Sequence, residues 1–530
     1  MDTSSSPLDT FEHVVVLMLE NRSFDNILGY LYQNGVPNGK KFEGVANKVP
    51  PLTNPDKDGN PVPVSVGTAF NQPYPDPGEE YDHITAQIFG TPMAAFTPQM
   101  NGFVEDYYNT LEALENLPSS KKDWPGSPAT QSAAIMNCFA PASLPVLSKL
   151  ATEFAVFDHW FCAVPSQTWC NRAFWHAATS WGWVNNPPAF DSSNPWNLDH
   201  WAVSSAGKTL FDLIEGQFGA GSWHVYEDLA VPFTKLVHWG DLKDKRGENY
   251  FRYLEGGHPF HQNFFDDCAK GKLPKYSFLE PHFINFFEDV LWHDDMHPSS
   301  FDSLIYANGG PGSVLLGDKL VWKIYQAIRN SKSPNGSNRQ NTLLIITFDE
   351  HGGCYDHVAP PPPPQVASPD PKGFNTGQGE KGFDFKRLGV RVPMVMVSQN
   401  IARNTIVNSQ MDHCSFLKTM QQKWGLTSLG PRQDAAPPFT EVFASSPRTD
   451  PWPDFPSYPG QSPALDATLM RHVDPNAVPV NGLQASILNA IVELYGKDPA
   501  VAALAGMRVK TAKDAQKLLE RVKVLRYPAR

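Results

Sequence analysis

The sequence predicts an α/β fold in which helices flank a central, mostly parallel sheet. Two short apolar runs, His13–Leu19 and Thr342–Phe348, are continuous and carry prominent β-branched residues, which is typical of strands buried on both faces of a parallel sheet. Apolar residues at helical spacing over 143–155 and 319–329 predict amphipathic helices. Because a helix and a loop lead into the second run, we expect a βαβ layout.

A third strand and long loops complete the predicted core. Residues 390–397 are largely apolar, and the strand should begin at or after Pro393, because proline cannot donate a hydrogen bond to a neighbouring strand. Residues 34–80 and 359–382 are rich in Pro, Gly and Asn, which predicts surface loops. Proline accounts for 49 of the 530 residues, nearly twice the usual share of about 5%, and this favours long irregular connections.

The chain is expected to contain a principal domain and a C-terminal extension. The principal domain is predicted to span 1–435 and to be followed by a Pro-rich linker over 436–463. Residues 464–530 contain two or three amphipathic helical patterns, so we expect a helical extension that packs on the principal domain. These helices either cover the mouth of a site or mediate self-association; the pattern favours neither, and the oligomeric state stays open.

Composition excludes several classes of protein. Lys and Arg total 43 against 55 Asp and Glu, a net charge of −12. We therefore expect no nucleic-acid partner, because such binding needs a basic surface. With 41% hydrophobic residues, the chain has enough apolar material to fold over most of its length. The six cysteines show no paired spacing, which argues against a disulfide scaffold or a thiolate zinc site.

The first residues carry no recognisable targeting signal. The run Val14–Leu19 is too short for a signal peptide or a membrane span, and no basic segment precedes it. No run of about 18 apolar residues occurs elsewhere in the sequence. As given, the chain is expected to be cytoplasmic, or secreted if a leader was removed or a non-classical route is used.

Acidic and amide side chains follow both apolar runs at the point where each run ends. Glu20 and Asn21 follow the first, and Asp349 and Glu350 follow the second. In open α/β sheets, ligands bind at the carboxyl ends of the strands, and paired carboxylates repel each other unless a cation or a proton lies between them. A single acid is more often a helix cap or an ion-pair partner. Two pairs at the ends of buried strands favour a metal site with oxygen ligands.

A hydroxyl-bearing segment and several histidines supply further reactive groups. Ser166 and Thr168 precede a predicted helix, whose positive end and free N–H groups attract an anion; the alternative for either residue is a simple N-cap. His297 and His83 are candidate proton donors for a leaving oxygen in phosphoryl transfer. The aromatic residues around Thr168 are expected to pack in the core, with a cation–π cage for a choline head group as the alternative.

Several blocks of the sequence resemble one known family. The blocks HVVVLMLENRSFDNILGYL, FAVFDHWFCAVPSQTWCNRAFWHAATSWG and LLIITFDEHGGCYDHVAPP resemble the phosphoesterase family of bacterial and plant non-specific phospholipases C and related acid phosphatases. FDFKRLGVRVPMVMVS and DMHPSS are further similar blocks, so the resemblance runs from about residue 11 to about residue 425. It implies an alkaline-phosphatase-like α/β core and a phosphoesterase catalytic domain at 1–435.

The resemblance implies a metal centre. Carried over by position, Glu20, Asn21, Asp349 and Glu350 correspond to metal ligands, and the Thr168 hydroxyl binds the same ion. The family implies one divalent metal ion, and the sequence leaves its identity open among Ca, Mg, Mn and Zn.

The resemblance also implies catalytic roles. The family nucleophile, a Ser or Thr shortly before an Asn-Arg pair, falls on Thr168, with Ser166 as the nearby competitor. Asn171 matches the asparagine of that motif, although a cysteine stands before it where the family usually has proline. His297 matches the His-Pro block, and His83 resembles a family histidine that follows an Asp-Pro-Gly segment, here with Glu-Glu-Tyr-Asp inserted.

These roles combine into one hypothesis. The metal lowers the pKa of the Thr168 hydroxyl, the alkoxide attacks phosphorus to give a phosphothreonine, Asn171 stabilises the equatorial oxygens, and His297 protonates the leaving alcohol. The expected substrate is a glycerophospholipid, cleaved at its phosphodiester to diacylglycerol and a phosphorylated head group. The alternative is a broad-specificity acid phosphatase acting on small phosphate esters.

Either enzyme, the phospholipase C or the acid phosphatase, is compatible with peripheral contact to a membrane surface. A non-enzymatic alternative is a membrane-surface binding module that uses the aromatic-rich loops. That alternative leaves the two pairs of strand-end acids unexplained.

Overall fold

The structure is a computed structural model of the 530-residue chain. It describes residues 6–67, 69–70, 72–90, 97–116, 126–188, 197–229, 231–256, 262–287, 290–298, 313–361, 379–461, 480–496, 498, 502 and 507–526. Much of the predicted loop at 359–382, the start of the predicted extension at 464–479 and the two serines that end the DMHPSS block lie outside the described residues.

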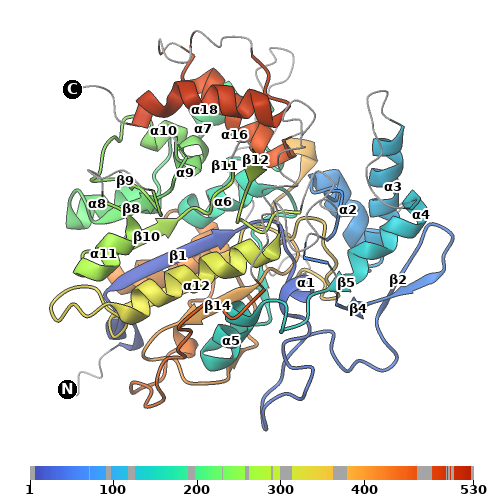
Figure 1. The fold of residues 1–530 in the computed structure, drawn as a ribbon, viewed down its shortest axis with the longest axis horizontal. Helices are drawn as coiled ribbons and strands as arrows, with labels where there is room; N and C mark the ends of the chain where they lie inside the picture. Colours follow the sequence, from blue (N-terminus) through green and yellow to red (C-terminus); the bar gives the residue numbers. More distant parts are fainter. Residues whose placement is uncertain are drawn as a thin grey trace.

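An eight-stranded sheet forms the centre of the molecule, with β1 in its interior (Figure 1). The strand order is β15-β6-β14-β13-β1-β10-β8-β9, and among these eight strands only β14 runs antiparallel to its neighbours. The predicted α/β fold with a mostly parallel sheet is therefore confirmed. The strands are β1 His13–Leu19, β6 Ala155–Phe157, β8 Trp223–Tyr226, β9 Phe251–Arg252, β10 Tyr276–Leu279, β13 Thr342–Phe348, β14 Met394–Val397 and β15 Thr405–Val407.

The two apolar runs of the sequence are neighbouring central strands. β1 and β13 pair in parallel over their full lengths, from His13 opposite Thr342 to Leu19 opposite Phe348. Every residue of β13 is buried, as expected for a strand covered on both faces. The third predicted strand begins directly after Pro393, as β14. The equal ends of β1 and β13 place the residues that follow them at one edge of the sheet.

Helices cover the sheet. α12 lies in front of β1 in Figure 1, with α5 and α11 packed against it, whereas α6 and α13 pack against each other behind the sheet. The predicted helices at 143–155 and 319–329 correspond to α5 and to the C-terminal two thirds of α12. The described helices are α1 Phe24–Leu28, α2 Tyr81–Phe89, α3 Phe103–Glu115, α4 Pro128–Gln131, α5 Pro145–Glu153, α6 Thr168–Ala177, α7 Leu198–Ser204, α8 Leu210–Phe218, α9 Phe233–Val237, α10 Trp239–Leu242, α11 Phe264–Lys270, α12 Val314–Asn330, α13 His413–Trp424, α14 Pro431–Ala435, α16 Gly482–Leu494 and α18 Ala512–Arg526.

Short elements occupy the connections. None of the small two-stranded sheets joins the central one. Their strands are β2 Thr53–Pro55, β3 Pro61–Pro63, β4 Ser65–Val66, β5 Asn137–Cys138, β7 Trp160–Phe161, β11 Asn285–Phe287, β12 Val290–Trp292 and β16 Met411–Asp412, and the 3₁₀ turns are η1 Pro7–Thr10, η2 Ser132–Met136, η3 Glu380–Gly382 and η4 Thr440–Val442.

The loop predicted at 34–80 is not a surface loop throughout, which corrects the expectation. Its last part turns inward, and Tyr74 and Glu79 are buried. Tyr107 Oη donates a hydrogen bond of 2.6 Å to the Pro75 carbonyl and ties this part to α3. A segment rich in Pro, Gly and Asn is expected to have an irregular backbone, but it need not be exposed. Such a backbone can be buried where its N–H and C=O groups form hydrogen bonds.

The segment predicted as a linker packs closely against α12. Trp452 is buried and stacks on Tyr325, with ring centroids 5.8 Å apart, and its indole N–H donates to Gln399 Oε1 at 3.0 Å. Tyr325 Oη donates to the Pro453 carbonyl at 2.8 Å. Beyond this segment, α16 contacts α7 and α9. The domain boundaries at 435 and 463 stay predictions.

Two further sequence expectations concern cysteines and membrane spans. All six cysteines lie in the described part of the chain, and none forms a disulfide. Within the described ranges, no helix combines the length and the apolar character that crossing a membrane requires.

Replacing Trp452 tests whether residues 436–461 belong to the folded unit. Trp452→Ala should lower the free energy of unfolding by about 3–5 kcal/mol, as for other large-to-small changes of buried aromatic residues. Chemical denaturation followed by circular dichroism measures this, with Val203→Ala, at a 73% exposed position, as the control. A Trp452→Ala protein as stable as the control would mean that the segment is an undocked tether.

Candidate active site

Four oxygen-bearing side chains meet where β1 and β13 end. Glu20, Asn21, Asp349 and Glu350 are all fully buried. The backbone N–H of Asn21 donates to Asp349 Oδ1 at 3.1 Å, which joins the two strand ends directly. Asn21 has a left-handed backbone with φ of 55°, a conformation that asparagine tolerates better than most residues. Gly352, also left-handed, lies so close that a Cβ there would collide with the Asn21 carbonyl.

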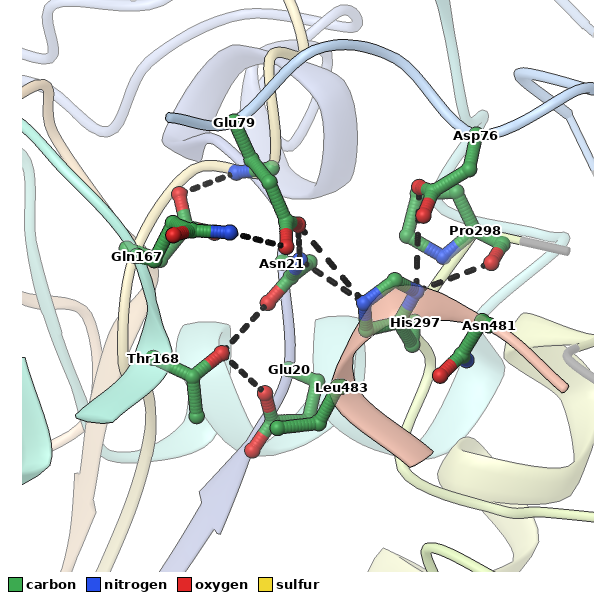
Figure 2. A network of polar contacts seen from close by, with 12 residues as sticks. Glu20, Asn21, Asp76, Glu79, Gln167, Thr168, His297, Pro298, Asn481 and Leu483 are labelled. Carbon is green, nitrogen blue, oxygen red and sulfur yellow. Dashed lines mark hydrogen bonds and ion pairs between the residues drawn. The ribbon is translucent and has the colours of Figure 1, made fainter. Parts of the chain in front are cut away.

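Thr168 lies over this acidic group, at the first position of α6 (Figure 2). Its Oγ1 donates to Glu20 Oε2 at 3.1 Å and lies 3.5 Å from Asn21 Oδ1. Gln167, not Thr168, is the N-cap residue of α6, so the threonine hydroxyl is not used for capping. Ser166 Oγ instead donates to Asn185 Oδ1 at 3.2 Å. The structure therefore brings the Thr168 hydroxyl, and not that of Ser166, into contact with the predicted metal ligands.

Arg172 is a site residue to which the sequence analysis gave no role. It lies one helical turn after Thr168 on α6, and its guanidinium donates to Glu20 Oε1, with Nε at 2.9 Å. The same Nε is 3.8 Å from Asp349 Oδ2. The guanidinium also lies over the rings of Phe233 and Phe283, at 5.6 and 5.2 Å from their centroids. A buried cation therefore offsets part of the negative charge between the strand ends.

Burial disfavours the negative charge that Arg172 leaves unbalanced on the strand-end carboxylates. Burial raises the pKa of the Glu20 carboxyl well above its usual range, with Arg172 opposing and Asp349 adding to the shift. Burial likewise raises the pKa of Glu350, and the negative charges of Glu79 and Asp349 raise it further. Asp349 Oδ2 and Glu350 Oε1 are buried and accept no hydrogen bond from any described residue.

The donor set fits a divalent cation. Clustered carboxylate and amide oxygens, two of them buried without a hydrogen-bond partner, suit hard or borderline divalent ions. Such an ion would supply the partners that the buried oxygens lack.

His297 reaches the group from a third segment. Its Nδ1 lies 2.9 Å from the Pro298 carbonyl, which assigns a proton to that nitrogen, and its Nε2 lies 3.0 Å from Asn21 Nδ2 and 3.7 Å from Glu79 Oε2. The His297 backbone N–H donates to Asp295 Oδ1 at 2.9 Å. His297 Nε2 thus faces the same space as Asn21, and this histidine joins the predicted site.

Glu79 and Asp76 also belong to the site, and the sequence analysis assigned neither. Glu79 accepts hydrogen bonds from Asn21 Nδ2 and, at 3.1 Å, from Gln167 Nε2. Asp76 Oδ1 lies 3.7 Å from His297 Nδ1. Burial raises the pKa of each carboxyl to about 8; the Glu80 charge adds to the shift of Glu79, whereas His297 opposes that of Asp76. The DPGEEYDH segment was the available signal, but it was read only for its histidine.

His83 lies apart from the groups that contact Thr168. On α2, its Nδ1 is 2.9 Å from Asp106 Oδ1, and this hydrogen bond raises the His83 pKa. Its ring packs against Gly78, where a Cβ would overlap the imidazole. No contact joins His83 to Thr168 or to the strand-end acids within the part of the chain that the structure describes.

Asn171 is fully engaged by the loop that precedes α6. Its Nδ2 lies within hydrogen-bonding distance of the carbonyls of Val164, Ser166 and Gln167, at 3.2, 2.8 and 3.2 Å. Its Oδ1 accepts from the Val164 N–H at 3.0 Å. These contacts fix the backbone that presents Thr168.

The aromatic residues around Thr168 pack in the core, as expected. Trp169 is fully buried against Trp201 and Phe233, with ring centroids 5.5 and 5.2 Å away. A second buried tryptophan, Trp175, stacks on Phe416 at 4.4 Å. Neither forms an open cage.

A second acid–histidine group comes from the same sequence blocks as the strand-end acids, but it has a structural role. Asp25, Asp356 and His357 lie within 4.8 Å of one another. Arg391 binds both carboxylates, with Nε 2.9 Å from Asp356 Oδ1 and Nη2 3.0 Å from Asp25 Oδ1. Arg391 also donates to the Glu43 carbonyl at 2.8 Å. The group is balanced by a guanidinium, so it braces the loops beside the site and does not call for a metal ion.

A cavity of about 550 Å³ opens beside these residues. Its lining includes Glu79 and Gln167 of the network drawn in Figure 2, together with Gly482, Ala485 and Ser486 of α16. Its described walls carry no Lys or Arg. They are formed by Asp76, Pro77, Glu79, Glu80, Gln167, Asn185, Asn186, Pro187, Pro188, Leu198, Glu380, Gly482, Ala485, Ser486, Asn489 and Ala490.

Comparison with known proteins gives this site a family. A model of the phosphoesterase family matches residues 11–427, which include the strand-end acids, Thr168 and His297. The chain belongs to the phosphoesterase family. It is therefore a hydrolase that acts on phosphate esters, and the family resemblance of the sequence blocks is confirmed.

Named relatives of this phosphoesterase include plant and bacterial enzymes. Non-specific phospholipase C6 of Arabidopsis thaliana is 34% identical over 465 residues, which cover 84% of this chain and 74% of that protein. Phospholipase C B of Mycobacterium tuberculosis is 26% identical over 446 residues, covering 79% and 74%. A solved structure of a protein in the alkaline phosphatase superfamily from Vibrio parahaemolyticus covers 55% of this chain and 63% of its own, with 14% identity and a TM-score of 0.31.

The raised pKa values predict how the metal-free phosphoesterase responds to pH. An unfolded chain loses the Glu79 proton near pH 4.5, whereas the folded metal-free protein holds it to about pH 8. Unfolding therefore releases this proton between those values, so the contribution of Glu79 to stability falls as pH rises through that window. Glu20 and Glu350 shift in the same direction.

A divalent cation should reverse this loss. After treatment with a chelator, added Mg²⁺, Ca²⁺, Mn²⁺ or Zn²⁺ should raise the melting temperature more at pH 8 than at pH 5, because protons compete for the same oxygens at pH 5. Differential scanning fluorimetry measures the shift, with Glu350→Gln as the impaired variant and the exposed Glu112→Gln as its matched control. The metal-site assignment would be contradicted if the cation raised the melting temperature equally at pH 5 and pH 8, or equally in Glu350→Gln and in the wild type.

Proposed function

We propose that this phosphoesterase cleaves the phosphodiester of glycerophospholipids in the manner of a phospholipase C, with Thr168 as nucleophile. The observation that carries the proposal is the Thr168 hydroxyl, at the start of α6 and 3.1 Å from Glu20 Oε2. A hydroxyl at a helix N-terminus and over clustered oxygen ligands combines an activated nucleophile with a site for the phosphate anion.

Glu20, Asn21, Asp349, Glu350 and the Thr168 hydroxyl would hold one divalent ion. When bound, the ion would keep the carboxylates ionised together and lower the pKa of the Thr168 hydroxyl. Arg172 keeps Glu20 oriented in either state, because its guanidinium binds the Glu20 oxygen that does not face Thr168. Calcium, magnesium, manganese and zinc all suit oxygen-rich sites of this kind.

The first chemical step forms a bond between Thr168 Oγ1 and phosphorus. Thr168 passes its hydroxyl proton to Glu20 Oε2, which accepts its hydrogen bond at 3.1 Å. The bond to the leaving alcohol breaks, and His297, which must carry protons on both ring nitrogens for this step, gives that alcohol its Nε2 proton. Asn171 acts as a positioning residue in this scheme, because its amide is used by the three carbonyls before α6. The positive end of α6, rather than the Asn171 side chain, would then face the equatorial oxygens of the phosphate.

The second step releases the phosphorylated head group. Water attacks the phosphorus of the phosphothreonine, and the neutral His297 takes a proton from that water at Nε2. The threonyl–phosphorus bond breaks, and Glu20 returns the proton to Thr168 Oγ1. Glu79 Oε2, 3.7 Å from His297 Nε2, would orient the imidazole in both steps. His83, bound to Asp106 on α2, has no assigned part in this scheme.

Charge favours a diester over a monoester substrate. The described walls of the cavity carry Asp76, Glu79, Glu80 and Glu380 and neither Lys nor Arg. A phosphate monoester dianion bears one more negative charge than a diester, so walls without Lys or Arg neutralise it less completely. The names of the relatives, which include non-specific phospholipases C, point to the same substrate class. An acid phosphatase acting on small monoesters remains the second candidate, favoured by the raised carboxyl pKa values.

Removing the nucleophile tests the chemistry. Thr168→Ala should lower kcat by at least about 1,000-fold, as for other covalent nucleophiles, while the melting temperature stays near that of the wild type. Thr168→Ser keeps a hydroxyl and should retain measurable turnover. Ser166→Ala is the matched control, because its hydroxyl faces Asn185; loss of activity there, with Thr168→Ala still active, would transfer the nucleophile to Ser166.

A paired assay tests the substrate class. The wild-type protein should release diacylglycerol from a phosphatidylcholine dispersion with a higher kcat/KM than it shows on p-nitrophenyl phosphate. Mass spectrometry of the products distinguishes cleavage on either side of the phosphorus. A strong preference for p-nitrophenyl phosphate, with no diacylglycerol formed, would favour the acid phosphatase.

A further inference from the structure

Gln87, on α2, is a buried glutamine that the proposed mechanism does not use. It is 1% exposed and is not among the described residues that line the cavity. Its Nε2 donates to the Gly78 carbonyl and to Asp106 Oδ2, both at 2.8 Å, and its Oε1 lies 2.9 Å from His351 Nε2. Three segments that are far apart in the sequence therefore meet at one side chain, where α2 packs against α3 (Figure 1).

These contacts fix the orientation of the Gln87 amide. The NH₂ group faces a carbonyl oxygen and a carboxylate oxygen, and both accept hydrogen bonds. Turning the amide over would place Oε1 against these two acceptors and leave buried donors unpaired, which is costly. Oε1 therefore faces the histidine, and this contact assigns a proton to His351 Nε2.

The first branch of these contacts leads to Glu79. The carbonyl that Gln87 binds belongs to Gly78, which directly precedes Glu79 in the chain. The Glu79 carboxylate in turn accepts a hydrogen bond from Asn21 Nδ2. Packing leaves little space here, because a Cβ on Gly353 would lie 2.7 Å from the Gly78 carbonyl oxygen. The amide thus holds the backbone from which Glu79 reaches the site.

The second branch leads to Glu350. His351 is fully buried, and its Nδ1 lies 3.4 Å from Glu350 Oε2. The same oxygen accepts from the Gly352 N–H at 2.6 Å. Glu350 Oε1 has no hydrogen-bond partner among the described residues. The imidazole and the Gly352 N–H thus restrict one oxygen of the carboxylate, and the other remains for a metal ion. Carboxylates that bind metal ions are commonly held by outer partners of this kind.

The third branch leads to the surface. Asp106 binds Gln87 through Oδ2, and its Oδ1 lies 2.9 Å from His83 Nδ1. Asp106 is 5% exposed, whereas the side chain of His83 is 36% exposed. His83 is therefore the outer end of a chain of contacts, whose other members are Asp106, Gln87, His351 and Glu350. The chain connects a histidine outside the site with one of the strand-end acids.

We propose that Gln87 is a positioning residue that sets the placement of Glu79 and Glu350 relative to each other. It acts on the first through the Gly78 backbone and on the second through the His351 ring. This inference rests on the proposed function, since it takes Glu350 as a ligand of the divalent ion. Outer partners of metal ligands contribute about 10- to 100-fold to metal affinity or activity.

Two substitutions break the chain at neighbouring points. Gln87→Met nearly keeps the size of the side chain but removes every hydrogen bond of the amide, and His351→Phe keeps a ring but removes both nitrogens. In each variant, the affinity of the chelator-treated protein for Mn²⁺, measured by isothermal titration calorimetry, should fall about 10- to 100-fold. The double variant should bind Mn²⁺ within about twofold of the weaker single variant, because both changes break the same link to Glu350.

Turnover provides a second readout. With saturating Mn²⁺ and a phosphatidylcholine dispersion, kcat of Gln87→Met should fall by about tenfold or more. KM should change little, because Gln87 does not line the cavity. A loss of stability alone would not separate kcat from KM at a temperature where the variant is folded.

Gln433 provides the matched control. It is also 1% exposed, and its amide is bound at both ends: Oε1 accepts from the Leu429 N–H at 2.8 Å, and Nε2 donates to the Leu417 carbonyl at 3.3 Å. Gln433→Met therefore loses buried hydrogen bonds of the same kind. It should lower the melting temperature as Gln87→Met does, but leave Mn²⁺ affinity and kcat unchanged.

The outcomes distinguish the inference from the function on which it rests. A wild-type protein that neither binds Mn²⁺ nor hydrolyses lipid or aryl phosphate would refute the proposed function. An active, Mn²⁺-binding wild type whose folded Gln87→Met variant keeps Mn²⁺ affinity and kcat within about twofold would overturn the inference alone, as would fully additive effects in the double variant. If Gln87→Met fails to fold, His351→Phe decides, because it removes only the branch to Glu350.

Discussion

The pairing of β1 with β13 is the constraint on which the site depends. Because the two strands are parallel, in register and of equal length, Glu20 and Asp349 leave the sheet side by side although 329 positions separate them in the numbering. A shift by one residue would turn the side chains at one strand end to the opposite face. Burial on both faces prevents that shift, since every residue of β13 and every residue of β1 except His13 is buried.

The same pairing creates an electrostatic problem that the neighbouring elements offset. Ionised carboxylates brought together without water repel one another, and the raised pKa values of Glu20 and Glu350 record that cost. Arg172 meets part of it from α6, the helix that also begins with Thr168. One helix therefore supplies the proposed nucleophile and a fixed counter-charge, four residues apart on one face. The acids that remain without partners are the reason the site suits a divalent cation.

The sequence was most informative where chemistry and pattern coincide. Apolar runs followed directly by acids predicted the central strands and the cluster of acids at their ends, because burial and periodicity are local properties. Glu79 and Asp76 were missed since they lie in a Pro- and Gly-rich stretch, where composition shows that the backbone is irregular but not that it is buried. The contacts of Asn171 could not be inferred either. The sequence shows an asparagine at this position, but not whether its side chain binds the preceding loop, as it does here, or a substrate.

Motif residues in this chain divide between chemistry and support, and only geometry separates them. Asp25 and Asp356 are embedded in the same blocks as Asn21 and Glu350, yet they bind Arg391 and leave no oxygen group in need of a cation. Asp349 and Glu350 show the reverse case, because each has a buried oxygen without a hydrogen-bond partner among the described residues. At the ends of β1 and β13, buried oxygens that lack a partner are therefore a better guide to cation binding than membership of a motif, because an unpaired buried oxygen is costly unless a ligand completes it.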